Sequence, residues 1–262
     1  MYEDETYTYP SIHFWLHLVV KHLSLRDLFN LRAVCHESYI VVTEYFRYMS
    51  DLDLSIVSER NRLTWEHFHL LTNYNCSFRR INLSNICCLN EILFHEILAR
   101  QTRLRSIDLS CAYKVTNETI NCLATNCTLV ERLILRYCHW LSDESFRLIT
   151  DRLEHLVELD VTCCWNIEDQ SVQMLFVKRG STLKHVCLSK LYSLSDWSIR
   201  SIATYGNRLS YLDISHCWRV TDHSIEALCK IGQLQQISIS NCSLITIVGR
   251  RHLIDSGIQI LS

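Results

Sequence analysis

The chain has 262 residues, of which 48% are hydrophobic and 21% charged, and its formal net charge is −2. This composition excludes an intrinsically disordered protein, and the near-neutral charge excludes a basic surface for nucleic acid. The acidic start of the chain lacks the basic region of a secretory signal, and no apolar run near it could span a bilayer. We therefore expect a cytoplasmic or nuclear protein with no nucleic-acid or membrane partner.

The first 48 residues predict a small helical module. Apolar residues recur at helical spacing from Phe14 to Leu23 and again from Leu25 to Val34. Ser24 separates the two runs and is a good residue to begin a helix. We therefore place a domain of short helices at residues 1–48.

From residue 49 onward the sequence repeats itself. The pattern L-x-x-L-x-L recurs, and its central apolar residue stands at positions 52, 81, 107, 133, 159, 186, 212 and 237. Spacings of about 26 residues fall in the range of leucine-rich repeats, and the alternation of apolar and polar residues predicts a short strand. We expect residues 49–262 to form an α/β solenoid of about seven to eight strand–turn–helix units. A last helix and strand near Arg250 to Gly257 would cap it.

A cysteine follows most of the expected strands. A thiol packs like a small apolar group and suits a buried turn, so we expect reduced, structural cysteines. The residues in question are Cys88, Cys138, Cys164, Cys217 and Cys242. No Cys-x-x-Cys pair occurs, which argues against a metal site.

Each repeat also contains a signal for the start of a helix. A hydroxyl side chain can accept a hydrogen bond from a free amide of the first turn, and an acid favours the positive end of the helix. The hydroxyl positions are Thr116, Ser142, Ser195 and Thr221, each followed within two residues by an acid.

The segment Leu23–Leu28, the pair Val34–Cys35 and Tyr9–Pro10 resemble the F-box motif. With the cysteine-bearing repeats behind them, nearly the whole chain is similar to the F-box/leucine-rich-repeat family. This resemblance implies a three-helix F-box that docks the Skp-type adaptor and, through it, cullin and RING subunits. It also implies a non-catalytic substrate-recognition subunit of an SCF-type ubiquitin ligase, which holds a protein for ubiquitination and proteasomal degradation. No cofactor is implied.

The resemblance also indicates which residues of the helical module contact the adaptor. We expect these contacts at Pro10, Leu16, Leu23, Leu25, Asp27, Leu28, Leu31, Val34 and Cys35.

The concave face of the solenoid is the expected substrate surface. Strand residues that flank the buried positions should point to this face. The candidates are Arg80, Asp108, Arg132, Ile134, Arg136, Glu158, Asp160, His185, Tyr211 and Asp213. The three arginines lie near one end of the solenoid and most of the acids lie further along it, which predicts a groove with positive and negative ends. The alternative is a face that only contacts solvent.

A row of rings follows the cysteine position. It consists of Tyr113, His139, Trp165, Tyr192 and Trp218, which should lie in register along one rim of the solenoid. Aromatic side chains dominate binding energy at many interfaces, so the row is a candidate substrate contact. Packing between successive turns is the other interpretation.

Catalytic motifs are missing from the sequence. It has no glycine-rich phosphate loop, no G-x-S-x-G motif, and no second histidine after His95–Glu96. We therefore expect no catalytic or metal site. A protein-interaction scaffold that assembles no ligase remains the alternative function.

Overall fold

The computed structural model describes residues 18–55, 71, 77–86 and 91–261. The chain divides into two compact units, residues 1–50 with 57–77, and residues 51–56 with 78–262. Within the described residues, the helices are all too short or too polar to cross a membrane.

The first unit contains two described helices, α2 (Leu25–Arg32) and α3 (His36–Tyr48). Ser24 caps α2 as expected, because its hydroxyl accepts the amide of Asp27 at 3.2 Å. Cys35 caps α3 in a reciprocal arrangement with the buried Ser38. The first of the three expected helices falls mostly on residues outside the described part. The buried apolar residues of α2 and α3 are Leu28, Val41, Val42 and Phe46.

The second unit is the expected solenoid. Its strands form one parallel sheet in chain order, and each residue of a strand pairs with the equivalent residue of the next repeat. The strands are β1 (Asp51–Asp53), β2 (Arg80–Asn82), β3 (Ser106–Asp108), β4 (Arg132–Ile134), β5 (Glu158–Asp160), β6 (His185–Cys187), β7 (Tyr211–Asp213), β8 (Gln236–Ser238) and β9 (Gln259–Leu261).

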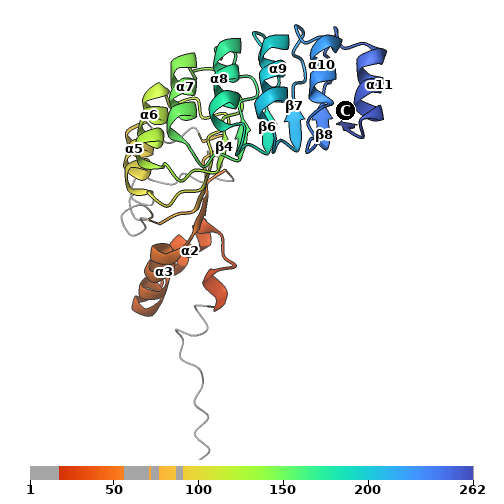
Figure 1. Ribbon diagram of the computed structural model, residues 1–262. Helices are drawn as coiled ribbons and strands as arrows, with labels where there is room; N and C mark the ends of the chain where they lie inside the picture. The colour runs from red at the N-terminus through yellow and green to blue at the C-terminus, as the bar shows by residue number, and fades with distance from the viewer. Residues whose placement is uncertain (1–17, 56–70, 72–76, 87–90, 262) are drawn as a thin grey trace, which may run out of the picture. The chain divides into compact units, whose positions relative to one another are not determined.

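The helices of the solenoid line up along the opposite side of the unit (Figure 1). They are α5 (Glu91–Arg100), α6 (Asn117–Asn126), α7 (Asp143–Arg152), α8 (Asp169–Arg179), α9 (Asp196–Tyr205), α10 (Asp222–Leu228) and α11 (Ile247–Asp255). The capping helix and strand expected in the tail are α11 and β9.

The core lies between the sheet and the helices. The central residue of each strand from β1 to β8 is buried, as the L-x-x-L-x-L pattern predicts. Helix residues such as Phe146 and Phe176 fill the space behind the strands. A single repeat has no such partner layer, so stacking is what buries the apolar face of every unit.

The turn after each strand from β2 to β8 uses a left-handed backbone conformation at a residue that is not glycine. This feature was not predictable from the sequence, since such residues favour φ below zero. The φ angles lie between 56° and 63° at Asn85, Cys111, Tyr137, Cys163, Lys190, His216 and Asn241.

The four expected hydroxyl caps are confirmed at Thr116, Ser142, Ser195 and Thr221. The helices are also linked to one another by a contact that we call the cap seam. In it, the aspartate that begins one helix accepts a hydrogen bond from the backbone amide of the N-cap residue of the next helix. The distance is 2.8 Å in each case. The acceptors are Asp143, Asp169, Asp196 and Asp222.

The seam changes the ionisation of Asp196. Burial opposes the charged form, but hydrogen bonds from Ser224 and Thr221 favour it, and the net effect lowers the pKa of this carboxyl. The folded state therefore favours the ionised form of this carboxyl.

Candidate functional site

The concave strand face presents the first and third residues of each strand. Because the strands are parallel and in register, equivalent residues form rows that cross the sheet. One row begins Asp51, Arg80, Ser106, Arg132 and Glu158, and the pairing registers place these residues side by side in that order.

The three arginines of this face are each bound to a carboxylate of a neighbouring repeat. Arg80 donates two hydrogen bonds, of 2.6 and 2.7 Å, to the carboxylate of Asp51. The hydrogen bonding and the negative charge of Asp51 raise the pKa of Arg80. Arg132 lies 2.9 Å from Glu158. The expected polarised groove is therefore wrong: the positive charges are neutralised in pairs.

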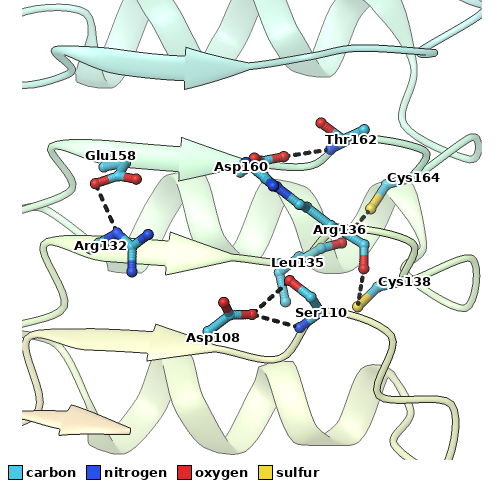
Figure 2. Close-up of polar contacts among 10 residues, drawn as sticks. All are labelled: Asp108, Ser110, Arg132, Leu135, Arg136, Cys138, Glu158, Asp160, Thr162 and Cys164. Atoms are coloured by element: carbon cyan, nitrogen blue, oxygen red, sulfur yellow. Dashed lines mark hydrogen bonds and ion pairs between the residues drawn. The ribbon is translucent and has the colours of Figure 1, made fainter. Parts of the chain in front are cut away.

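The third pair joins Arg136 to Asp160 at 2.5 Å (Figure 2). Burial lowers the pKa of Arg136, but the attraction of Asp160 outweighs it and the net shift is upward. Asp160 is almost fully buried, and so is Ile134, whose register partners are Asp108 and Asp160. The expectation of an open side chain is wrong for these two candidates.

The other predicted strand residues lie on the concave face. Arg80, Arg132 and His185 are exposed, whereas Asp108, Glu158, Tyr211 and Asp213 are half-buried. Burial raises the pKa of Tyr211 to about 12, so its phenol stays protonated and can donate a hydrogen bond.

All four acids at the third position of the strands have a structural task that the sequence reading missed. The side chain of Asp108 accepts the amide of Ser110 at 2.8 Å and thereby closes the turn after β3 (Figure 2). This is a local side-chain-to-backbone turn, in which Asn can replace Asp. The same bond is made by Asp53, Asn82, Asp160 and Asp213.

The concave face has a shallow depression of about 240 Å³ at its N-terminal end. Asp51, Arg80 and Arg132 lie on its border, and Asp53, Ser106 and Asp108 also line it. The small side chain of Ser106 between two arginines leaves this space open.

The aromatic rim is the five expected rings together with Tyr137, which the sequence reading missed. The imidazole of His139 stacks on Trp165 with centroids 4.1 Å apart, and Trp165 stacks on Tyr192 at 6.3 Å. Trp218 meets Tyr192 edge-on at 6.2 Å. The period of 26 residues was the signal for the register, but Tyr137 stands two positions earlier in its repeat and was outside that pattern.

The rim rings both join repeats and face solvent. Trp218 donates from Nε1 to the carbonyl of Tyr192, and Nδ1 of His139 lies 2.9 Å from the carbonyl of Cys163. Even so, between 45% and 66% of the accessible surface remains exposed at Tyr113, Trp165, Tyr192 and Trp218. The two interpretations of the row are therefore compatible, because packing against neighbouring turns holds the rings in place on the surface.

The cysteines beneath the rim serve the backbone. The thiol of Cys164 donates to the carbonyl of Leu135 in the preceding repeat at 3.0 Å, and Cys138 does the same to Leu109 at 3.2 Å. Burial raises the pKa of Cys138 to about 12, which keeps the thiol protonated. All eleven described cysteines are free, and Cys88 lies outside the described residues. A group of three potential metal ligands does not occur in the described part of the chain.

The predicted adaptor contacts divide into three classes. Asp27, Val34 and Cys35 are exposed, with 73% of Val34 accessible. Leu23, Leu25 and Leu31 are half-buried. Leu28 is only 1% accessible, so its expected contact role is wrong and it belongs to the helical core. Pro10 and Leu16 lie outside the described residues.

Comparison with known proteins agrees with the repeat architecture. A family profile described as "Leucine Rich repeat" matches residues 152–176. In the crystal structure of the Rad7 and Elc1 complex from yeast, one chain matches 86% of this chain with a TM-score of 0.68 and 20% identity. The match covers 57% of that chain.

Two curated proteins are similar in sequence. Lysine-specific demethylase 2B of Mus musculus is 24% identical over 77% of this chain, and the SCF E3 ubiquitin ligase complex F-box protein pof2 of Schizosaccharomyces pombe is 26% identical over 59%. The matches cover only 16% and 38% of those two proteins. The profile match and the nine-stranded parallel sheet agree on the fold, which is that of a leucine-rich-repeat solenoid.

Proposed function

We propose that the protein is a substrate-recognition subunit of an SCF-type ubiquitin ligase, in which residues 1–48 dock a Skp-type adaptor and the solenoid holds a target protein. The observation that carries this proposal is the aromatic rim on the repeat scaffold, in which His139, Trp165, Tyr192 and Trp218 contact one another in succession at the surface. Exposed rings of this kind are typical binding anchors.

Sequence similarity supports the ligase assignment. The F-box protein pof2 is named as part of such a complex, and the match to it spans 59% of this chain. Within the F-box/leucine-rich-repeat family, we infer a resemblance to F-box/LRR-repeat protein 15 in length and order of elements. In this role the protein needs no catalytic group of its own, because bringing a substrate close to the activated ubiquitin raises the rate of transfer.

Adaptor capture tests the proposal directly. Purified full-length chain should retain a purified Skp-type adaptor on an affinity column. Val34→Glu should abolish this retention, because it places a charge on an exposed apolar position of the F-box-like module. Val177→Glu is the matched control, since Val177 is also an exposed valine but lies on α8 of the solenoid.

The alternative is an interaction scaffold that assembles no ligase. If the folded full-length chain never retains the adaptor, the receptor proposal fails and the scaffold remains. If both valine variants bind the adaptor like the parent chain, the docking surface lies elsewhere.

A further inference from the structure

The concave face has more negative charge than its arginines can balance. Among the described strand and turn residues of this face, Arg80, Arg132 and Arg136 are matched by Asp51, Glu158 and Asp160. Asp53, Asp108 and Asp213 form no ion pair with a described residue. Their only bonds with described residues go to the turns that follow their own strands.

Two of these three acids, Asp53 and Asp108, line the same depression at the N-terminal end. Each uses Oδ1 for its turn, at 2.9 and 2.8 Å, which leaves Oδ2 without a bond to the described residues. Ser106 also lines the depression, and its hydroxyl forms no bond with the described residues. The depression therefore offers two carboxylate oxygens and a hydroxyl, while both bordering arginines are already neutralised.

The size of the depression suits a side chain. Its volume of about 240 Å³ is below the roughly 300–1,000 Å³ of pockets that enclose small molecules. Asp53 and Asp108 stand in one row, on β1 and β3, so two strand spacings, roughly 10 Å, separate them. In a peptide with polyproline II conformation, which has three residues per turn, side chains three residues apart point to the same side and span about the same distance.

We propose that this depression is a subsite for basic side chains, and that the target segment presents lysine or arginine residues, spaced as Lys-x-x-Lys, to Asp53 and Asp108. The inference takes the concave face as the substrate surface and so rests on the proposed function. It reverses the simplest reading of the sequence, in which three arginines would favour an acidic partner. An acidic segment would meet two carboxylates here that form no ion pair with a described residue, although Asp108 also attracts Arg136.

Peptide binding to the full-length chain tests this subsite. The probes are two Gly/Ser peptides of equal length, one with a central Lys-x-x-Lys and one with Glu-x-x-Glu, titrated by NMR at low ionic strength, where screening is weak. The lysine peptide should bind at least about ten-fold more tightly than the glutamate peptide, since it gains two ion pairs where the other meets repulsion.

Three single variants locate the effect. Asp53→Asn and Asp108→Asn should each weaken binding of the lysine peptide by up to about five-fold. Folding should be preserved, because Asn82 already makes the same turn bond at the equivalent position. Asp213→Asn is the matched control: it removes an acid from the same strand position on β7, outside the depression, and should leave binding unchanged.

Equal binding of the two peptides, or no effect of Asp53→Asn and Asp108→Asn in folded protein, overturns the subsite. An equal effect of Asp213→Asn would show general attraction by the face and would also overturn it. Adaptor retention measured on the same preparations separates the two proposals. A chain that retains the adaptor but does not prefer lysine keeps the ligase function and loses only the subsite.

Discussion

The imidazole of His139 lies nearly flat against the indole of Trp165, with ring centroids 4.1 Å and ring planes 22° apart. These two residues occupy equivalent positions in successive repeats, so the stack follows directly from the repeat period. Tyr192 continues the stack on the other side of Trp165. Trp165 therefore has rings on both faces, whereas Trp218 meets one ring of the rim, edge-on.

Alanine substitutions at two tryptophans of the rim should affect protein stability and target binding to different extents. Trp165→Ala removes two ring pairs and should lower the free energy of unfolding by about 1–3 kcal/mol, at roughly 0.5–1.5 kcal/mol per pair. Trp218→Ala should cost less stability but about 2 kcal/mol of target affinity if this ring is a hot spot. Chemical denaturation and quantitative mass spectrometry of captured proteins measure the two effects.

Trp197 provides the control for the rim. It is 69% accessible on α9 and lies off the rim, so Trp197→Ala removes the same side chain from a different surface. If Trp218→Ala and Trp197→Ala capture the same proteins in the same amounts, the rim is not part of the target site.

The buried cysteines should behave as structural, reduced thiols. Cys164→Ala should cost about 1 kcal/mol, because it deletes the hydrogen bond from the thiol to the carbonyl of Leu135, which then accepts only the amide of Cys138. Cys229→Ala, at the half-buried end of α10, should cost less. Thiol titration of denatured, unreduced protein should find all 14 cysteines, and a clearly lower number would contradict the assignment.

Leu28 and Leu25 should differ in the helical module. Leu28→Ala opens a cavity in the core between α2 and α3 and should destabilise this unit by about 2–5 kcal/mol. Leu25 is half-buried, so Leu25→Ala should cost less stability. Proteolysis of the module and adaptor retention, measured together, should show that Leu28→Ala loses binding through unfolding. Intact protease resistance in Leu28→Ala would refute its core role.

The cap seam should make stability depend on pH through Asp196. Its lowered pKa means that folding favours the carboxylate. The added stability is present above the unfolded-state pKa of about 4 and is lost as the pH falls through the lower folded-state pKa. Asp196→Asn should therefore be about 0.5–1 kcal/mol less stable than the parent chain at pH 7, with the difference shrinking below pH 4. A difference that stays constant from pH 7 to pH 3 would contradict this explanation.

The repeat period made most of the fold predictable. Once Leu133, Leu159 and Leu212 were aligned, the parallel sheet, the buried face and the rim followed from alternation within the strand and repetition between strands. The hydroxyl caps were equally local, because Ser or Thr before an acid is a signal contained in three residues.

Contacts between repeats were harder to predict. The sequence shows that Arg132 and Glu158 stand on one face, but only the register shows that they are opposite one another and neutral as a pair. Burial of Asp160 depends on the arginine that folds over it from the preceding turn. Leu28 shares the apolar side of α2 with Leu25, Phe29 and Leu31, and the helical pattern alone does not tell which of these residues packs against the neighbouring helix.

The direction of the cap seam has a mechanical consequence. Each aspartate of the seam holds the helix that follows it, so the last cap held is that of α11, by Asp222. A force applied to the two ends of the solenoid would then act on these contacts one after another rather than all at once. We expect extension in optical tweezers to proceed in steps of about one repeat. The plateaus between steps should be shorter in duration when Asp169 or Asp196 is replaced by asparagine.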